Sequence, residues 1–351
     1  MILKLPVSRM EELFSLISGE RTLYLPVLNN EVPEFGRWTP DAALALDRLN
    51  TVKSPKDFFF PQTEDIVSFK THGKEILIEE TRDPAEAFAI FGVRSCDAES
   101  LKIIDRVFLG DPADTFYQSR RENCVLISSA CFQPEETCFC GSFNIDPLSP
   151  LGDISTWLLS DTLYWKSLTE RGNVLTDKVK GLFENAASHD EELLASAQAK
   201  AKELFSKLPF HGLRPEKYHA EKLMEKFNSS QWGDLNPTCL CCGTCTFICP
   251  TCHCYDIQDF DTGSGIQRFR CWDSCMYSDF TLMAHGNPRP NQMQRFRQRY
   301  MHKLVYFPEK NEGLTACVGC GRCVAKCPIS MNIVKVIKAF ETPQNKVRGG
   351  N

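Results

Sequence analysis

The chain has 351 residues, enough for two domains with their own cores, and its formal net charge at pH 7 is -5. This acidic balance argues against nucleic acid as the main partner. The 18 cysteines are roughly three times the usual number for this length. The N-terminus carries no secretory signal pattern, and no apolar run reaches the ~18 residues of a transmembrane segment. We therefore expect a cytoplasmic protein whose thiolates are free to bind metal.

Residues 1–170 are predicted to form an α/β domain. The apolar runs at 87–93 and 124–130 are typical of buried parallel strands. Between them, behind a predicted N-cap at Asp97, apolar side chains recur at helical spacing, namely Leu101, Ile104 and Phe108. Strand, helix and strand in this order predict a βαβ unit with a right-handed crossover.

Four cysteines follow these two strands. Cys96 comes directly after the first strand, and one loop after the second strand carries Cys131, Cys138 and Cys140. Because α/β sheets place their sites at the carboxyl ends of parallel strands, the four thiolates are expected to converge, enough for an iron–sulfur cluster. Free core cysteines plus a zinc ion are the alternative. Cys124 begins the second strand, so it is expected at the opposite end of the sheet as a small buried apolar side chain.

Residues 171–232 are predicted to form a helical connector. The stretch at 180–207 is rich in Ala, Glu, Lys and Leu and is expected to form one long helix or a pair of helices. Beyond the connector the cysteines become dense, so a separate cysteine-rich domain is expected at 233–351.

Two stretches of this domain share the spacing C-x2-C-x2-C-x3-C-P, starting at Cys239 and at Cys317. In two-cluster ferredoxins the fourth cysteine of such a run binds the other cluster. The spacing therefore predicts two [4Fe–4S] clusters with crosswise ligands: Cys239, Cys242, Cys245 and Cys327 for the first, and Cys317, Cys320, Cys323 and Cys249 for the second. Glycines inside the runs are expected where backbone amides approach sulfur, namely Gly243, Gly319 and Gly321.

The C-terminal domain is expected to be a mainly helical, two-cluster, ferredoxin-type domain. The 67 residues at 250–316 between the motifs are far more than a compact β-rich ferredoxin needs. Zinc is the alternative occupant, but zinc sites use two close cysteines and then a gap, not this rhythm twice.

Further cysteines lie between the two motifs. Cys252, Cys254 and Cys275, with Cys271, are expected either to form another cluster or zinc site or to be unligated thiols. Cys241 is interpreted as a bystander that points away from the cluster loop. His253 is interpreted as a solvent-exposed neighbour.

A basic segment at 289–303 has no acidic residue. It contains five cations, namely Arg289, Arg295, Arg297, Arg299 and Lys303. One interpretation is a solvated helix face. The other is a docking patch for an acidic partner subunit, with Phe296 and Tyr300 as apolar anchors.

The chain resembles a family of iron–sulfur subunits, the 4Fe-4S dicluster proteins, which includes an iron–sulfur subunit of anaerobic sulfite reductase and the beta subunit of soluble sulfhydrogenases. The ferredoxin motifs alone are common, and the N-terminal blocks make the resemblance specific. The matching segments are KSPKDFFFPQTE (53–64), FGVRSCD (91–97), RRENCVLI (120–127), CFCGS (138–142), CPTCHCYD (249–256), RCWDSCM (270–276) and CVGCGRC (317–323).

The resemblance implies a third [4Fe–4S] cluster, because the family pattern includes the equivalents of Cys96, Cys131, Cys138 and Cys140. It also includes those of Cys252, Cys254 and Cys275, whereas Cys241 and Cys271 depart from it. Such subunits conduct electrons between a flavoprotein subunit that binds FAD and NAD(P)H and a catalytic subunit. The sequence agrees, since it has neither a G-x-G-x-x-G after a strand nor a Walker A motif.

We therefore expect an electron-transfer subunit of an oxidoreductase complex of anaerobic metabolism, with no catalytic residues of its own. The alternative is a reductase with a substrate-reducing or thiol redox centre in the N-terminal domain. A zinc-based scaffold is a third hypothesis. The sequence does not indicate whether the complex acts on sulfite, on protons or hydrogen, or on a disulfide.

Overall fold

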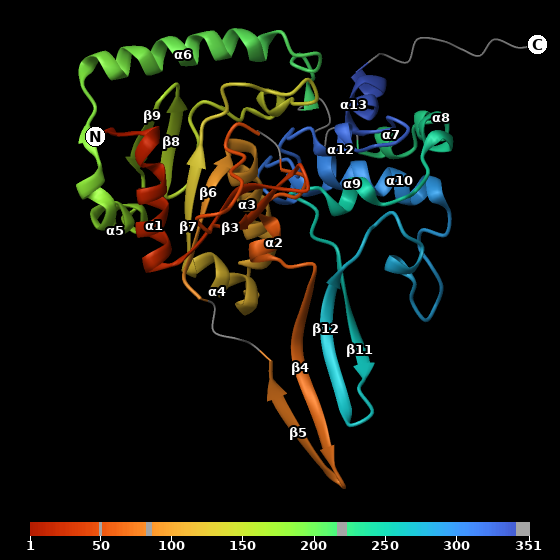
Figure 1. Ribbon diagram of the computed structural model, residues 1–351. Coiled ribbons are helices and arrows are strands. Elements are labelled where there is room, and N and C mark those ends of the chain that lie inside the picture. Colours follow the sequence, from red (N-terminus) through yellow and green to blue (C-terminus); the bar gives the residue numbers. More distant parts are fainter. Residues whose placement is uncertain (49–50, 82–85, 216–222, 342–351) are drawn as a thin grey trace, which may run out of the picture.

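The chain folds around two β-sheets in the computed structural model, which describes residues 1–48, 51–81, 86–215 and 223–341 (Figure 1). The larger sheet has eight strands in the order β10-β1-β9-β8-β7-β6-β2-β3. The pairs β2–β6, β6–β7 and β7–β8 are parallel, and the other pairs of this sheet are antiparallel. The strands are β1 (Leu3–Pro6), β2 (Thr22–Asn29), β3 (Val32–Arg37), β6 (Phe88–Arg94), β7 (Cys124–Ser129), β8 (Ile154–Leu159), β9 (Thr162–Ser167) and β10 (Glu184–Asn185).

Helices cover both faces of this sheet, so the expected α/β architecture of the N-terminal region is confirmed. The side chains of β6 alternate between two cores, with Ala89 and Phe91 on one face and Phe88 and Ile90 on the other. The first core is closed by α1 (Met10–Glu20) and α5 (Glu170–Val179), and the second by α2 (Lys56–Phe59), α3 (Ser95–Phe108) and α4 (Thr115–Asn123).

The predicted βαβ unit is present, because β6 and β7 are adjacent and parallel and α3 lies between them in the chain. The expected N-cap at Asp97 is wrong. Helix α3 begins at Ser95 with Arg94 at the N-cap position, which puts Asp97 in the first helical turn, where it is 1% exposed. Cys124 begins β7 and is fully buried, as expected.

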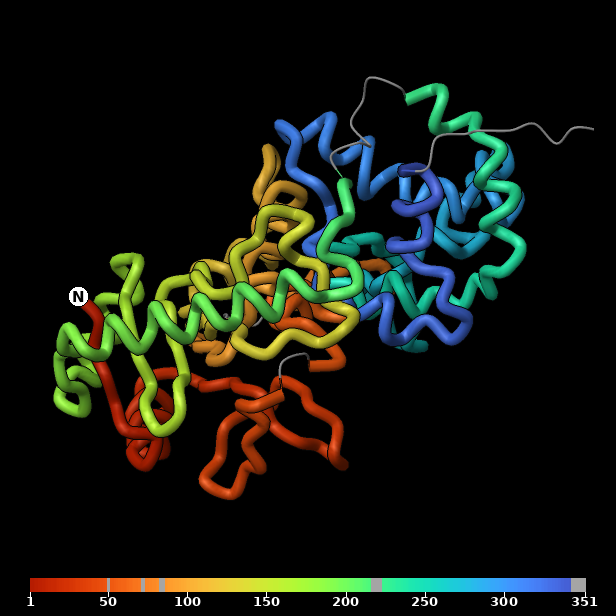
Figure 2. The backbone as a smooth tube through the Cα atoms, turned by 90° about the horizontal axis from the view of Figure 1, so that it is seen from above, coloured from red at the N-terminus to blue at the C-terminus, as the bar shows by residue number. Residues whose placement is uncertain are grey.

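The stretch predicted to be helical at 180–207 contains one long helix, α6 (Ser188–Ser206). Seen from above, α6 runs across the N-terminal part of the molecule (Figure 2). Two short helices follow in the connector, α7 (Leu223–Phe227) and α8 (Gln231–Leu235), and residues 216–222 lie outside the described residues. No helix in the described ranges is both long and apolar enough to cross a membrane.

Short helices form the C-terminal part around a core of its own. This core packs Trp232 against Phe296, Tyr300 and Ile337. Between α10 and α11 the chain makes a π-helical segment at His302–Tyr306. The helices are α9 (Thr244–Phe247), α10 (Gln292–Met301), α11 (Phe307–Lys310), α12 (Arg322–Ala325) and α13 (Ile333–Glu341).

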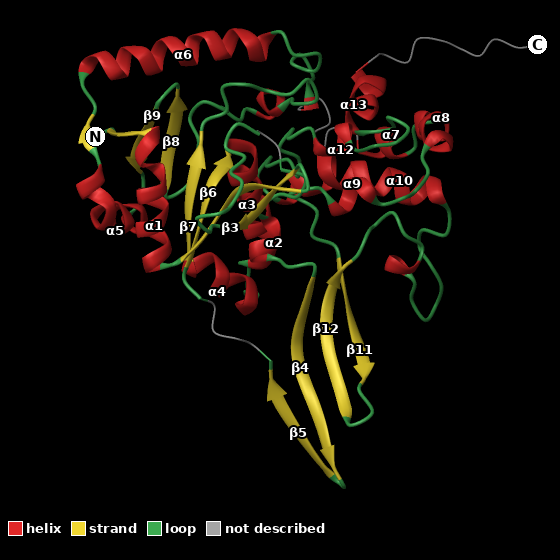
Figure 3. Ribbon diagram, viewed as in Figure 1, coloured by secondary structure: helices red, strands yellow, loops and turns green. Residues whose placement is uncertain are grey.

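The second sheet has four antiparallel strands in the order β11-β12-β4-β5 and extends away from the helices (Figure 3). We call it the arm; its strands are β4 (Thr63–His72), β5 (Glu75–Glu80), β11 (Tyr255–Asp261) and β12 (Gly265–Trp272). The expectation of a mainly helical C-terminal domain is not confirmed, because β11 and β12 lie between the two cysteine motifs. Since β12 pairs with β4, the arm also joins the predicted domains 1–170 and 233–351, whose boundaries stay a prediction.

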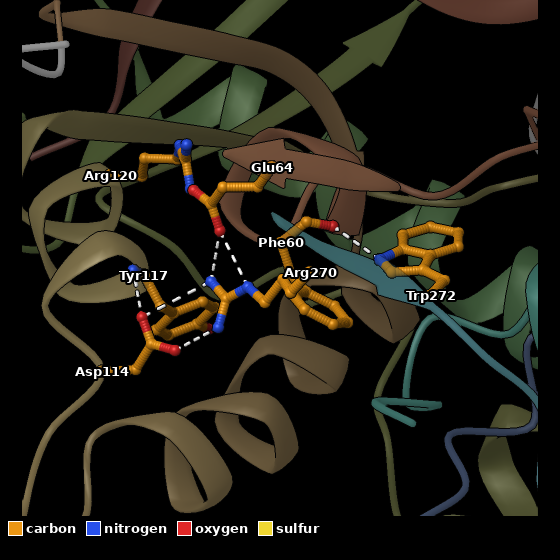
Figure 4. Close-up of polar contacts among 7 residues, drawn as sticks. All are labelled: Phe60, Glu64, Asp114, Tyr117, Arg120, Arg270 and Trp272. Carbon is orange, nitrogen blue, oxygen red and sulfur yellow. Dashed lines mark hydrogen bonds and ion pairs between the residues drawn. The ribbon is translucent and has the colours of Figure 1, made fainter. Parts of the chain in front are cut away.

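A buried network of charged residues fixes the base of the arm to the body (Figure 4). Arg270 of β12 is 5% exposed and donates to Glu64 of β4 at 2.8 and 2.5 Å. It also pairs with Asp114, the N-cap of α4, and Arg120 of α4 pairs with Glu64. Strands from both parts of the chain are therefore held against the same helix.

Candidate iron–sulfur sites

The structure brings the cysteines of the first predicted cluster together. Cys239, Cys242 and Cys245 surround the start of α9, and all three line one cavity with Cys327, which follows α12. The backbone N–H of Cys241 donates to the Sγ of Cys239 at 3.4 Å. Cys241 also lines this cavity, and its side chain donates to the carbonyl of Met276 at 2.9 Å.

The cysteines of the second predicted cluster also share a cavity. Cys317, Cys320 and Cys323 line it together with Cys249 from the first motif. Each motif thus contributes its fourth cysteine to the cavity of the other. Burial raises the pKa of Cys317 to about 11 and that of Cys320 to about 12, so metal binding there has to displace a proton from each thiol.

The donor sets fit a cluster better than a single ion. In the described part of the chain, no three His, Cys, Asp or Glu side chains converge as they would around one metal ion. A tetrahedral zinc site holds its sulfur ligands about 3.8 Å apart, given its bond length. A [4Fe–4S] cluster instead spreads four thiolates over four separate irons. Four cysteines around one cavity are the number that a [4Fe–4S] cluster binds.

Three buried cations lie beside these cavities. Their charges give a second test of whether the residues suit an iron–sulfur cluster. Lys56, Arg299 and Lys303 are only 2%, 2% and 4% exposed. Lys303 Nζ donates to Cys249 Sγ at 3.4 Å, and Arg299 Nη1 lies 3.9 Å from Cys252 Sγ. Lys56 Nζ donates to the carbonyl of Cys252 at 2.9 Å.

Burial alone would lower the pKa of Lys303, but the negative charge of the neighbouring Cys249 raises it above its usual value. The pKa of Cys249 is held well below its usual value, first by its hydrogen bond with Cys252 and then by Lys303 and Arg299. Buried cations need buried anions. Ionised cysteines, or a cluster that they bind, satisfy this requirement, and neutral thiols do not.

Three of the four N-terminal cysteines lie on one loop. Cys131, Cys138 and Cys140 lie on the loop after β7, and burial together with the other two thiols raises the pKa of Cys140 to about 12. Cys96, in the first turn of α3, packs with Cys140 and with Cys320 of the second cavity in one buried cluster. This third group of cysteines is therefore a direct neighbour of the second cavity.

The contact between the N-terminal loop and the second motif explains why two positions of that motif are glycine. Both have a left-handed backbone, with φ of 61° at Gly319 and 77° at Gly321. A Cβ would lie 2.5 Å from the carbonyl oxygen of Phe139 at Gly319, and 2.6 Å from that of Thr137 at Gly321. The N–H of Phe139 donates to the carbonyl of Gly319 at 2.9 Å. Glycine is needed here because the loop with Cys138 and Cys140 lies against the motif.

A buried ion pair, which the sequence did not indicate, locks the same junction. Arg322 of α12 donates to both carboxylate oxygens of Asp97 at 2.5 and 2.8 Å, and to the carbonyl of Thr51 at 2.9 Å. Asp97 and Arg322 are 1% and 4% exposed. Because Asp97 is adjacent to Cys96 and Arg322 to Cys323, the pair joins the third group of cysteines to the second cavity.

The remaining cysteines divide into two kinds. The hairpin of β11 and β12 brings Cys254, just before it, close to Cys275, just after it; the hydrogen bond between them lowers the pKa of Cys254. Cys252 lies beside Cys249. Cys271 lies within β12, opposite Asp256 and Thr63, and apart from this group.

Both interpretations of the basic segment 289–303 are wrong for its central residues. Phe296, Arg299, Tyr300 and Lys303 recur at the i, i+3, i+4, i+7 spacing of a buried helix face, and all four are at most 4% exposed. They can be neither a solvated face nor a docking patch. The physical reason is that cysteines distant in the sequence provide the negative charge that holds the cations inside.

The expectation for His253 is also wrong. Its ring is partly buried against His302, with ring centres 5.5 Å apart, and its Nδ1 lies 3.1 Å from the carbonyl oxygen of Thr251. Burial lowers its pKa to about 4, which leaves the ring neutral at pH 7.

Comparisons with known proteins agree with this arrangement. Residues 238–331 match the family model of the 4Fe-4S dicluster domain. The chain is 32% identical over 329 residues to sulfhydrogenase 2 subunit beta of Pyrococcus furiosus, an alignment that covers 93% of this chain and 94% of the relative. No solved structure matches the chain. The resemblance is thereby confirmed, and the chain belongs to the iron–sulfur subunit family that includes the sulfhydrogenase beta subunit.

Proposed function

We propose that this chain is the electron-transfer subunit of a multi-subunit oxidoreductase. It relays electrons between a flavoprotein subunit that handles NAD(P)H and a catalytic subunit such as a hydrogenase, a sulfite reductase or a disulfide reductase. The observation that carries the proposal is the contact between three groups of cysteines, two from the dicluster domain and one from the α/β domain. The relative, named as a subunit, supports the existence of partner subunits.

The proposed ligands follow the cavities. Cys239, Cys242, Cys245 and Cys327 would hold one [4Fe–4S] cluster, Cys317, Cys320, Cys323 and Cys249 a second, and Cys96, Cys131, Cys138 and Cys140 a third. When bound, such clusters supply one-electron transfer at a potential set by their surroundings. The protein holds the thiolates, excludes water and places buried cations beside them. Cys252, Cys254 and Cys275 receive no cluster in this proposal.

The contacts favour one order of the three sites. The N-terminal group touches the second cavity through Cys96, Cys140 and Cys320, all of them buried. The second cavity is connected to the first by Arg299, which lines the second and donates to the carbonyl of Cys245 in the first at 3.0 Å. The first cavity reaches solvent at Cys242, which is exposed. The order is therefore N-terminal group, second cavity, first cavity, surface.

The test is to purify the chain anaerobically and to measure iron, acid-labile sulfide and zinc. We expect about twelve irons, at four per cluster, and no zinc. In the assembled complex, Cys320→Ser should abolish electron flow between the partner subunits and leave each partner's own half-reaction intact. Cys271→Ser, at a cysteine outside all three groups, is the matched control and should change neither quantity. Zinc without iron would disprove the proposal.

A second candidate function rests on a cavity of about 160 Å³ at the carboxyl ends of β6 and β7. Arg94, Ser129 and Gln133 line it, and Ala130 and Phe132 place it beside Cys131. Carboxyl ends of parallel strands are the usual position of ligand sites. A reductase with its own centre in the N-terminal domain would use this cavity. Reduction of sulfite or of a small disulfide by the isolated chain with reduced methyl viologen would favour this candidate.

A further inference from the structure

The buried Lys303 makes an unusually complete set of contacts with the second cavity. Its three ammonium hydrogens have three acceptors: Cys249 Sγ at 3.4 Å, Thr251 Oγ1 at 2.8 Å and the carbonyl of Ala316 at 2.9 Å. The carbonyl of Lys303 in turn accepts from the N–H of Ala316 at 3.0 Å. Since Ala316 precedes Cys317, the lysine is fixed to both segments that supply ligands to this cavity.

The backbone around Lys303 is adapted to this position. The residue lies in the π-helical segment His302–Tyr306, between α10 and α11. π-Helical turns are rare and are frequently found at functional sites. Arg299, one turn earlier, lines the same cavity, and its Nε is buried with no hydrogen-bond partner among the described residues. Two cations of one helix face therefore point toward the ligand set of Cys249.

Burial and charge act on a cluster at this site in opposite directions. A four-thiolate [4Fe–4S] cluster becomes more negative when it gains an electron, and burial penalises the form with more charge. Burial therefore lowers the reduction potential of the second site relative to the more exposed first site. A fixed positive charge 3.4 Å from a ligand sulfur stabilises the extra electron and raises the potential. The cation thus offsets the effect of burial.

We propose that Lys303, supported by Arg299, sets the reduction potential of the second site so that this buried site accepts an electron at potentials accessible to the exposed first site. The lysine is a positioning and charge-compensating residue. One electron is gained from the neighbouring site in each step, no bond breaks, and no proton is consumed, because the ammonium group already carries the compensating charge. This inference rests on the proposed function and names a residue that sets the potential of one site in the relay.

The test is an EPR-monitored redox titration of the intact chain with Lys303→Met, which keeps most of the length of the side chain and removes its charge. We expect the equilibrium constant for reduction of one cluster to fall at least tenfold. For one electron this is a midpoint potential more negative by about 59 mV. Lys303→Arg, which keeps the charge, should stay close to the wild-type value. Lys310→Met is the matched control, since Lys310 is an exposed lysine of α11, and should leave all midpoints unchanged.

The outcomes separate this inference from the proposed function. A missing [4Fe–4S] signal in the wild-type chain would disprove the function. A full cluster content with an unchanged midpoint in Lys303→Met would disprove only the inference, as would equal shifts in Lys303→Met and Lys310→Met. If Lys303→Met loses iron, Lys303→Gln replaces it, because Gln can still donate hydrogen bonds without a charge; a wild-type midpoint in that variant would also overturn the proposal.

Discussion

The two ferredoxin-type cavities arise from motifs with identical spacing, yet their surroundings differ. The first has an exposed cysteine, Cys242, and opens toward solvent. The second contains the buried Cys249 and Cys320 and is covered by the N-terminal domain, which contributes Asp97 and the loop 137–140. A repeated motif thus repeats the cysteines but not their environment. Part of the environment of the second cavity comes from residues more than a hundred positions away in the sequence.

The largest effect is expected from breaking the buried ion pair that covers the second cavity. Asp97→Asn leaves Arg322 buried without its carboxylate, which should lower the free energy of unfolding by about 3–5 kcal/mol. As denaturant is added, iron should leave the second cavity and the N-terminal group before it leaves the first cavity. Denaturant unfolding and iron analysis measure both. The control is Asp259→Asn, at an exposed pair with Arg268, where a change of at most about 1 kcal/mol is expected; equal losses in the two variants would contradict the comparison.

A smaller effect is expected from separating the N-terminal loop from the second motif. Gly319→Ala forces a Cβ to within 2.5 Å of the Phe139 carbonyl, in a left-handed backbone. Gly73→Ala is the matched control, because Gly73 has the same φ of 61° and nothing within 4 Å of its Cβ position. Both variants should lose about 1–2 kcal/mol from the backbone alone. The free energy of unfolding of Gly319→Ala should fall by roughly 1–3 kcal/mol more, because the added methyl group overpacks the junction. Thermal unfolding measures this, and equal falls in melting temperature for the two variants would contradict the contact between Gly319 and the Phe139 loop.

The smallest effect is expected at the open first cavity. Tyr277 donates its hydroxyl to the carbonyl of Cys242 at 3.1 Å, and neither residue is buried. Tyr277→Phe removes this single hydrogen bond, so the free energy of unfolding should fall by less than about 1 kcal/mol. Iron content should not change. A loss as large as that of Asp97→Asn would mean that the two cavities are equally dependent on their surroundings.

Local sequence patterns predicted the parts of the fold that depend on near neighbours. The apolar runs identified β6 and β7, and the position of Cys96 and Cys131 after them placed both at the same edge of the sheet. Each set of four cysteines that the spacing groups together lines one cavity. In each case the pattern is local, a βαβ unit at 88–129 or a cysteine motif at 239–249 or 317–327.

The arm was missed because its pairing is not local. Strands β11 and β12 have no sustained alternation of apolar and polar residues, and all of β11 is exposed. Gly263, with φ of 79°, lies in their turn, but one glycine between two cysteine motifs does not distinguish a hairpin from a break between helices. The pairing of β4 with β12 joins residues about 200 positions apart, and no local pattern indicates it.

The buried cations were missed for a related reason, although a signal was present. The basic residues at 289–303 resembled a surface segment because charged side chains are mostly exposed. Yet Phe296, Arg299, Tyr300 and Lys303 follow the spacing of a single helix face. Cations at core positions of a helix, in a chain rich in cysteine, indicate a buried anionic group.

The arm also constrains the order in which the protein can be completed during synthesis. Strand β4 emerges early, but its neighbour β12 is about 200 residues later, a delay of roughly 10–40 s at ribosomal rates. Until then β4 has only β5 as a partner, and a two-stranded hairpin is marginally stable in water. The first cavity likewise lacks Cys327 until residue 327 has been added. Cluster insertion into this protein is therefore a step that follows synthesis of both halves.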